Sequence, residues 1–197
     1  KAGIIKPGVP VVFDGNNREA ADVIRARAES LGCPWYEVKE EKQELKDYTP
    51  EGIRFVSDSR VYGKTELFIP FIARYQMMNG ALALETMGVL KKDHHLEKET
   101  LIRGMKNTRW QGRMETILPG VIVDGAHNED GIAKFVETVE YFQKDYPITL
   151  LFSTVSDKDF RDMIHEIRKG LHFSCVVITE IWGSRKQSSA ELAELFK

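Results

Sequence analysis

Apolar residues recur with strand-like and helical periods along the first half of this 197-residue chain. The charged stretch Lys39–Lys46 interrupts the pattern and is expected to form a solvated loop. The elements predicted on either side of it are, in order, a strand at 10–14, a helix at 16–32, strands at 34–38, 53–57 and 66–71, and a helix at 74–90. This order is typical of the end of an α/β domain that is closed by a hairpin.

The second half alternates strand and helix more regularly. The charge-rich segment Lys91–His95 separates the halves, and we expect a domain boundary at 93/94. The elements predicted beyond it are a helix at 97–105, strands at 121–125, 148–152 and 175–179, and helices at 132–142, at 159–171 and from 188. Such alternation with short links predicts a mostly parallel sheet with right-handed crossovers. Strand 121–123, which is Val-Ile-Val, is expected to be buried.

Composition adds limits to this α/β picture. Apolar residues make up 42% of the chain, which is enough for real cores, and 28 basic residues are interspersed with 30 acidic ones. This balance gives no electrostatic reason to expect a nucleic acid partner. Cys33 and Cys175 are far apart and are expected to be buried free thiols in a reducing compartment. No apolar run reaches the roughly 20 residues that span a bilayer, so a protein of the cytoplasm with no membrane partner is expected. The protein is also expected to be a monomer. Trp110 and Trp182 are expected to pack.

Polar side chains that suit phosphate chemistry gather around one predicted strand. Arg113 precedes the strand, and Asp124, His127 and Asn128 follow it, where the chain turns into a helix. Ligands of open α/β sheets bind at the carboxyl ends of strands. An arginine can pair with a phosphate through two parallel hydrogen bonds. The arrangement therefore predicts a phosphate-handling site.

This segment resembles the W-x-G-R-x-E and D-G-A-H-N motifs of the Mur ligase superfamily, in its folylpolyglutamate synthase/dihydrofolate synthase branch. Lys1–Pro10 is similar to that branch's K-A-G-I-x-K-x-G-x-P segment. Tyr75, Gln76 and Asn79 resemble its H-Q-x-x-N helix start, with Tyr in place of His, and Ser156–Asp159 contains its D-K-D turn. The four motifs occur in the family's order.

The resemblance implies a fold and an activity. Residues 1–93 would be the C-terminal part of the central ATP-binding domain, and residues 94–197 the Rossmann-like glutamate ligase domain. The activity would be ATP-dependent addition of L-glutamate to folate through an acyl phosphate, with Mg²⁺. Dihydropteroate as a second acceptor, and thus dihydrofolate synthase activity, is left open.

The resemblance also implies roles for single residues. Asn79, Arg113 and Asp124 would contact ATP, and His127 would act in catalysis near the incoming amino acid. Lys1 would take up carbon dioxide as a carbamate, act in catalysis and hold Mg²⁺ through oxygen, the ligand that this metal prefers. Simpler roles stay open: a turn cap for Asp124, a helix cap for Asn79, and an ordinary lysine for Lys1.

The sequence contains no Gly-rich P-loop of the G-x-x-G-K-[ST] kind. Gly63-Lys64-Thr65 lacks the glycine five residues earlier, where Asp58 stands, and it fits a hairpin turn better. The resemblance implies a P-loop upstream of Lys1, so the chain is expected to be a C-terminal fragment that is inactive alone. Two alternatives remain: another Mur-type amide ligase, acting on a peptidoglycan precursor or on cyanophycin, or a non-catalytic nucleotide-binding module.

Overall fold

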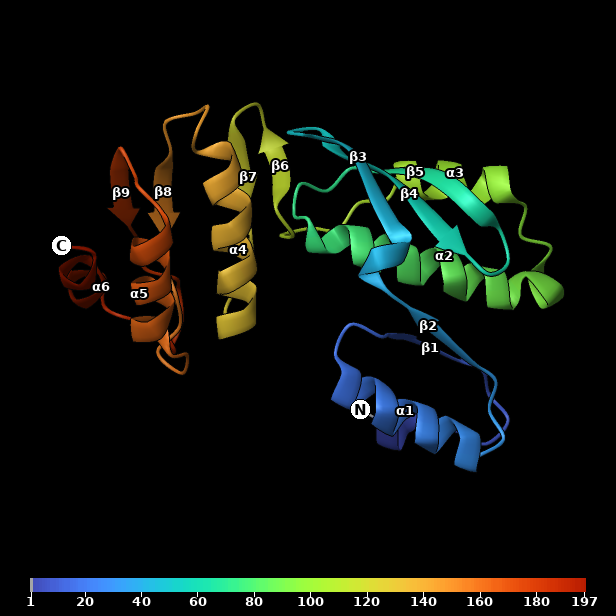
Figure 1. Ribbon diagram of the computed structural model, residues 1–197. Coiled ribbons are helices and arrows are strands. Elements are labelled where there is room, and N and C mark those ends of the chain that lie inside the picture. The colour runs from blue at the N-terminus through green and yellow to red at the C-terminus, as the bar shows by residue number, and fades with distance from the viewer. Residues whose placement is uncertain (1) are drawn as a thin grey trace. The chain divides into compact units, whose positions relative to one another are not determined.

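The computed structural model describes residues 2–197, except for the side chains of Lys92 and Asp93. The chain forms two compact units, which meet in sequence between Trp110 and Gln111 (Figure 1). This point lies after the boundary expected at 93/94. Helix α3 (Lys98–Lys106) packs on strand β5 (Gly63–Ile69) and therefore belongs to the first unit.

The first unit begins with a short 3₁₀ turn at Ala2–Ile4. The strand-helix-strand motif that the sequence predicts follows it. Strands β1 (Val11–Asp14) and β2 (Trp35–Val38) run parallel, and helix α1 (Arg18–Ser30) connects them. Asn17 caps the helix, because its Oδ1 accepts a hydrogen bond from the Ala20 N–H at 3.0 Å. The parallel pair and its helix confirm the α/β pattern in this part of the chain.

A three-stranded antiparallel sheet follows, and one of its strands was not predicted. Strand β3 (Gln43–Thr49) pairs with β4 (Gly52–Ser59), which pairs with β5. The loop expected at 39–46 is instead a 3₁₀ turn at Glu40–Lys42 and the start of β3. As an edge strand β3 keeps most of its polar side chains in water, so its sequence lacks strand-like alternation. The hairpin expected near Gly63 is confirmed.

Two helices pack against this sheet. Helix α2 (Tyr75–His94) covers β4, and it runs through most of the segment that was expected to break at 91–95. A side chain at Gly80 would place its Cβ 3.1 Å from Cζ of Phe55, so the glycine lets α2 approach β4 closely. The core between the helices and the sheet consists of Ile53, Phe55, Leu67, Ile69, Phe71, Met77 and Leu84.

The second unit contains three further helices and two small sheets. Its elements are β6 (Glu115–Leu118), β7 (Val121–Val123), α4 (Glu129–Phe142), β8 (Thr149–Phe152), α5 (Phe160–Gly170), β9 (Cys175–Ile178) and α6 (Ser189–Phe196). Strands β8 and β9 are parallel, whereas β6 and β7 form an antiparallel hairpin. The α/β class is confirmed, with parallel strands in small sheets.

The burial expected for Val121–Val123 is wrong. These three side chains are 43%, 45% and 41% exposed. In the part of the chain that the structure describes, β7 pairs only with β6, so it is one strand of a two-stranded ribbon and not an inner strand. Strand β6 was itself not predicted.

The core of the second unit lies between its helices and the β8–β9 pair. It consists of Ile132, Val139, Phe142, Leu150, Phe152, Met163, Ile164, Ile167, Leu171 and Leu192. The ring of Phe152 meets that of Phe196 edge to face, with centroids 5.4 Å apart. Trp110, at 65% exposure, and Trp182, which is fully exposed, do not pack as expected. Cys33 is buried as expected, whereas the burial expected for Cys175 is wrong, since its side chain is exposed.

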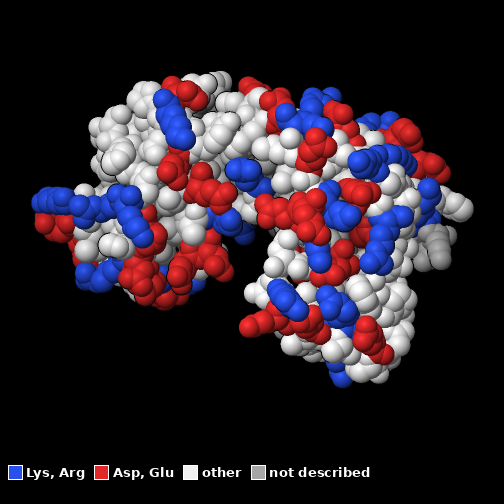
Figure 2. All heavy atoms as spheres, viewed as in Figure 1, with Lys and Arg blue, Asp and Glu red and all other residues white. Residues whose placement is uncertain are grey.

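Two surface properties bear on function. Among residues 2–197, none of the helices combines the length and the apolar character that crossing a bilayer requires. On the face drawn in Figure 2, basic and acidic side chains are intermixed over both units.

Candidate functional site

The β6–β7 hairpin brings the two halves of the predicted phosphate site together. Glu115 and Val123 are the pair at its open end, so the residues before β6 lie beside those after β7. The Gly125 N–H donates to the Gly112 carbonyl at 2.8 Å. A Cβ on Gly125 would lie only 3.3 Å from that carbonyl oxygen, which explains a glycine at this contact.

Asp124 fastens this junction through both carboxylate oxygens. Its Oδ2 accepts the Met114 N–H and its Oδ1 accepts the Ala126 N–H, each at 2.8 Å. The turn-capping role that the sequence left open is therefore present. Each carboxylate oxygen keeps a second lone pair, so these bonds leave acceptor capacity for a ligand.

Arg113 stands at the centre of a strained turn. The residues on either side have left-handed backbones, Gly112 with φ of 66° and Met114 with φ of 47°. Such a conformation is uncommon for a residue other than glycine, asparagine or aspartate, and it is held here by the buried Met114 side chain. Nη1 of the half-buried guanidinium would lie 3.7 Å from a Cβ on Gly125. The described residues give this guanidinium no hydrogen-bond or ion-pair partner, so it is available to an anion.

His127 lies just beyond, in the exposed loop that leads into α4. Its Nδ1 lies 2.8 Å from the Gly125 carbonyl. A carbonyl oxygen can only accept, so Nδ1 carries the hydrogen and donates it, and in the neutral ring Nε2 is left as an acceptor. Asn128 caps α4 through a bond from the Gly131 N–H at 2.8 Å.

Two predicted site residues do not belong to the second unit as described: Asn79, which is in the first unit, and Lys1. Asn79 belongs to the first unit, in the second turn of α2, so it is not a helix cap. Its Nδ2 donates to Oε1 of the buried Gln76 at 2.9 Å. Lys1 lies outside the described residues, and its expected roles as carbamate, catalytic group and Mg²⁺ ligand are not addressed.

The D-K-D turn contributes mainly local contacts. Asp157 pairs with Arg185 at 3.2 Å, and Asp159 caps α5 through the Asp162 N–H at 3.4 Å. This turn follows β8, and the loop after β9 meets it, because the Ser156 N–H donates to the Arg185 carbonyl at 2.8 Å. Both loops therefore lie at the carboxyl edge of the parallel pair.

A carboxylate in the loop after β9 holds the start of α6. Glu180 accepts the Ser189 N–H and hydroxyl at 3.0 Å, and Nζ of Lys186 at 3.2 Å. The Ser189 backbone bond, followed by the Lys186 contact, lowers the pKa of Glu180 from its ordinary 4.5 to about 2. The group is structural, since its oxygens serve the helix terminus.

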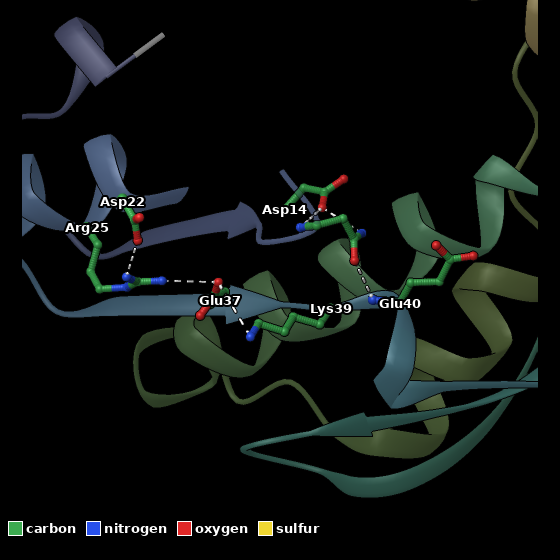
Figure 3. A network of polar contacts seen from close by, with 7 residues as sticks. Asp14, Asp22, Arg25, Glu37, Lys39 and Glu40 are labelled. Atoms are coloured by element: carbon green, nitrogen blue, oxygen red, sulfur yellow. Dashed lines mark hydrogen bonds and ion pairs between the residues drawn. The ribbon is translucent and has the colours of Figure 1, made fainter. Parts of the chain in front are cut away.

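A second polar network lies in the first unit, at the βαβ motif (Figure 3). Arg25 of α1 reaches Asp22 at 2.8 Å and Glu37 at 3.3 Å, and Lys39 lies 4.0 Å from Glu37. These contacts, with the Asp22 hydrogen bond first, raise the pKa of the Arg25 guanidinium above its ordinary value. The acidic and basic groups satisfy one another, so this network fastens α1 to β2.

The described residues by themselves do not make a metal site. No group of three or more His, Cys, Asp or Glu side chains among them lies close enough to hold an ion. Asp124 is one oxygen ligand whose oxygens already accept N–H groups. The described site therefore fits a phosphate group, through Arg113, better than it fits Mg²⁺.

One residue of the site received no role from sequence reasoning. Oε2 of Glu115 accepts the Gly112 N–H at 2.8 Å and so closes the other side of the turn that carries Arg113. The signal was present, because the glutamate follows the glycine by three residues in the W-x-G-R-x-E segment. The Glu115 carboxylate reaches back to the Gly112 N–H because the backbones of Gly112 and Met114 are left-handed. The motif alone does not show these conformations.

Comparison with known proteins identifies similar chains. Residues 112–197 match the family model described as Mur ligase, glutamate ligase domain. The chain is 31% identical over 182 residues to the dihydrofolate synthase/folylpolyglutamate synthase of Bacillus subtilis, covering 88% of this chain and 42% of that protein. It is 30% identical over 192 residues to the folylpolyglutamate synthase of Lacticaseibacillus casei, covering 93% and 44%. The chain thus spans less than half the length of these relatives.

Solved structures agree with this similarity. A folylpolyglutamate synthase from Thermotoga maritima matches the whole chain and 46% of its own with a TM-score of 0.84, and at 24% identity this shows the fold. A folylpolyglutamate synthase complex with AMPPCP and folate matches 98% of this chain and 48% of its own, at 28% identity and a TM-score of 0.78.

Proposed function

We propose that the chain is part of a Mur ligase superfamily protein, and that the gene product containing it is an ATP-dependent ligase that adds L-glutamate to folate. The names of the relatives support folate as the acceptor. Whether the enzyme also accepts dihydropteroate is a finer question, because only some of the relatives are named as dihydrofolate synthases. We expect a monomeric cytoplasmic enzyme with small-molecule substrates and no nucleic acid partner.

The observation that carries this proposal is the Arg113 guanidinium, which has no hydrogen-bond or ion-pair partner among the described residues, at a junction built by Asp124. A half-buried cation without an ion partner is a good receptor for phosphate, and its planar fork can bind two oxygens at once. When bound, ATP supplies the phosphoryl group that turns an acceptor carboxylate into an acyl phosphate. Arg113 would offset charge on the transferred group. Asp124 would keep the turn in place and use its remaining lone pairs toward the nucleotide.

His127 would serve the second half of the reaction. The amine of L-glutamate must lose a proton as it attacks the activated carboxylate, and Nε2 of a neutral His127 is an acceptor. The Nδ1–H bond to Gly125 fixes which nitrogen is free. Transfer to a positioned base contributes roughly 10²- to 10⁴-fold to rates of this kind.

The remaining assignments are also proposals. Residues 112–197 would be the glutamate ligase domain, and the first unit would be the end of the central ATP-binding domain. Asn79, with an amide that both donates and accepts, suits the base or ribose of ATP. Lys1, as a carbamate, would hold Mg²⁺ together with ligands from the rest of the gene product.

Product analysis with a panel of acceptors tests the function. The complete gene product is incubated with ATP, Mg²⁺ and L-glutamate, and with a reduced folate, dihydropteroate, a sugar-linked peptidoglycan precursor or a cyanophycin-type peptide. We expect ADP and a glutamylated product with the folate. Turnover only with one of the last two acceptors would favour the other Mur-type ligases, and tight ATP binding without turnover on any acceptor would favour a non-catalytic module.

A further inference from the structure

Glu115 contacts the candidate site through a backbone N–H group, that of Gly112. This group belongs to the turn that carries Arg113. The turn Gly112–Met114 has two left-handed residues in three, and one of them is a methionine. Backbone conformations of this kind persist only where the surroundings hold them. Its anchors include the buried Met114 side chain, the Asp124 bond to the Met114 N–H, and the Glu115 bond to the Gly112 N–H.

The anchors lie on both sides of one side chain. Asp124 accepts the N–H of Met114, the residue after Arg113, and Glu115 accepts the N–H of Gly112, the residue before it. The carbonyl of Gly112 is fixed as well, by the Gly125 N–H. A long guanidinium side chain loses much rotamer freedom when it binds an anion, so a fixed backbone beneath it lowers that cost.

We propose that Glu115 is a positioning residue for Arg113, whose carboxylate holds the Gly112–Met114 turn in the conformation that presents the guanidinium to an anion. Glu115 acts through the Gly112 amide and makes no contact with the ligand. The identity of the anion as the phosphate of ATP rests on the proposed function, whereas the positioning itself does not.

An isosteric pair of variants separates the hydrogen bond from the bulk of the side chain. Glu115→Gln keeps an oxygen that accepts the Gly112 N–H, and Glu115→Met has similar length without a comparable acceptor. Thr116→Ala, at the exposed neighbouring position of β6, is the matched control. All three are made in the 197-residue chain, and thermal melts establish that each is folded.

Two nuclear magnetic resonance readouts decide the question without any nucleotide. The first is hydrogen exchange of the Gly112 amide, and the second is the order parameter of the Arg113 Nε–H group. We expect Glu115→Met to speed exchange by about tenfold to a hundredfold, the range expected for a lost bond to a charged group, and to lower the Arg113 order parameter. Glu115→Gln and Thr116→Ala should stay close to the parent chain.

The opposite outcomes overturn the positioning role. Unchanged exchange and order in Glu115→Met would show that the turn holds itself, and equal effects of the Gln and Met variants would show that the acceptor is not what matters. Failure of the ligase activity is a separate result, because it is measured with substrates on the complete gene product.

Discussion

At the scale of single residues, one aspartate performs a structural task and is also proposed to face the ligand. Both oxygens of Asp124 hold backbone amides, so replacing it would disturb the Arg113 turn as well as any nucleotide contact. Activity loss at Asp124 therefore cannot separate the two roles. Arg113, which has no partner among the described residues, gives the cleaner test.

Arg113→Ala in the complete gene product should lower kcat/KM for ATP by roughly tenfold to a hundredfold or more, because a charge-assisted contact is worth about 1.5 to 3 kcal/mol. The melting temperature should stay near that of the parent, since no ion pair or hydrogen bond is lost. Arg113→Lys is the control: it keeps the charge but loses the planar fork and should recover only part of the activity. Steady-state kinetics that do not change in either variant would remove Arg113 from the site.

His127→Ala should affect a different kinetic constant. If Nε2 accepts a proton from the attacking amine, kcat should fall by roughly 10²- to 10⁴-fold, while the KM for ATP changes little. His127→Gln, which lacks a titrating nitrogen, should be nearly as slow. A variant with normal kcat and a raised KM for L-glutamate would instead assign His127 to binding alone.

At the scale of elements, the start of α6 depends on a carboxylate from the preceding loop. The lowered pKa of Glu180 means that its ionised form is favoured by folding. That contribution is complete above the ordinary pKa of 4.5 and is lost as pH falls toward about 2. The melting temperatures of the chain and of Glu180→Gln should therefore differ most near neutral pH. The difference should shrink as the pH falls from 4.5 to about 2. A difference that stays constant down to about pH 2 would contradict this explanation.

Sequence patterns predicted elements well where side-chain period and burial agree. Helix α1, strands β1 and β2 and helices α3 to α6 were found in this way. Strand β3 was missed because its exposed edge carries polar side chains. The burial of Val121–Val123 was overestimated because the spacing of apolar residues along a strand does not show which strands become its neighbours. Helix α2 continues through Lys91–His94, since the two lysines are good helix formers, and it ends at His95, whose backbone is left-handed.

The candidate site was predictable to a similar degree. Motif spacing placed Arg113, Asp124 and His127 at one strand end, and the structure brings their backbones together. The direction of the hydrogen bonds was not predictable, because it depends on the left-handed turn around Arg113. Glu115, in the same motif, gained a role only when the backbone was known.

At the scale of the whole molecule, the absence of a P-loop from the sequence has a direct consequence. The 197-residue chain alone should show no ATP-driven ligation, because Arg113 and Asn79 cannot replace the backbone amides and lysine that cradle the phosphates in a P-loop. The assay measures ADP after mixing the chain with ATP, Mg²⁺, L-glutamate and a reduced folate. Turnover that depends on all four would refute this expectation, and omission of each component in turn is the control.

If a carboxylate is activated by phosphoryl transfer and then joined to L-glutamate, the path of one carboxylate oxygen reveals it. The complete gene product is given a folate whose reacting carboxylate carries ¹⁸O at both oxygens, with ATP, Mg²⁺ and L-glutamate. An acyl phosphate predicts one ¹⁸O atom in each inorganic phosphate formed, because the C–O bond breaks when the amine attacks. Label found in AMP, or lost to water while the inorganic phosphate released with ADP carries none, would rule out an acyl phosphate.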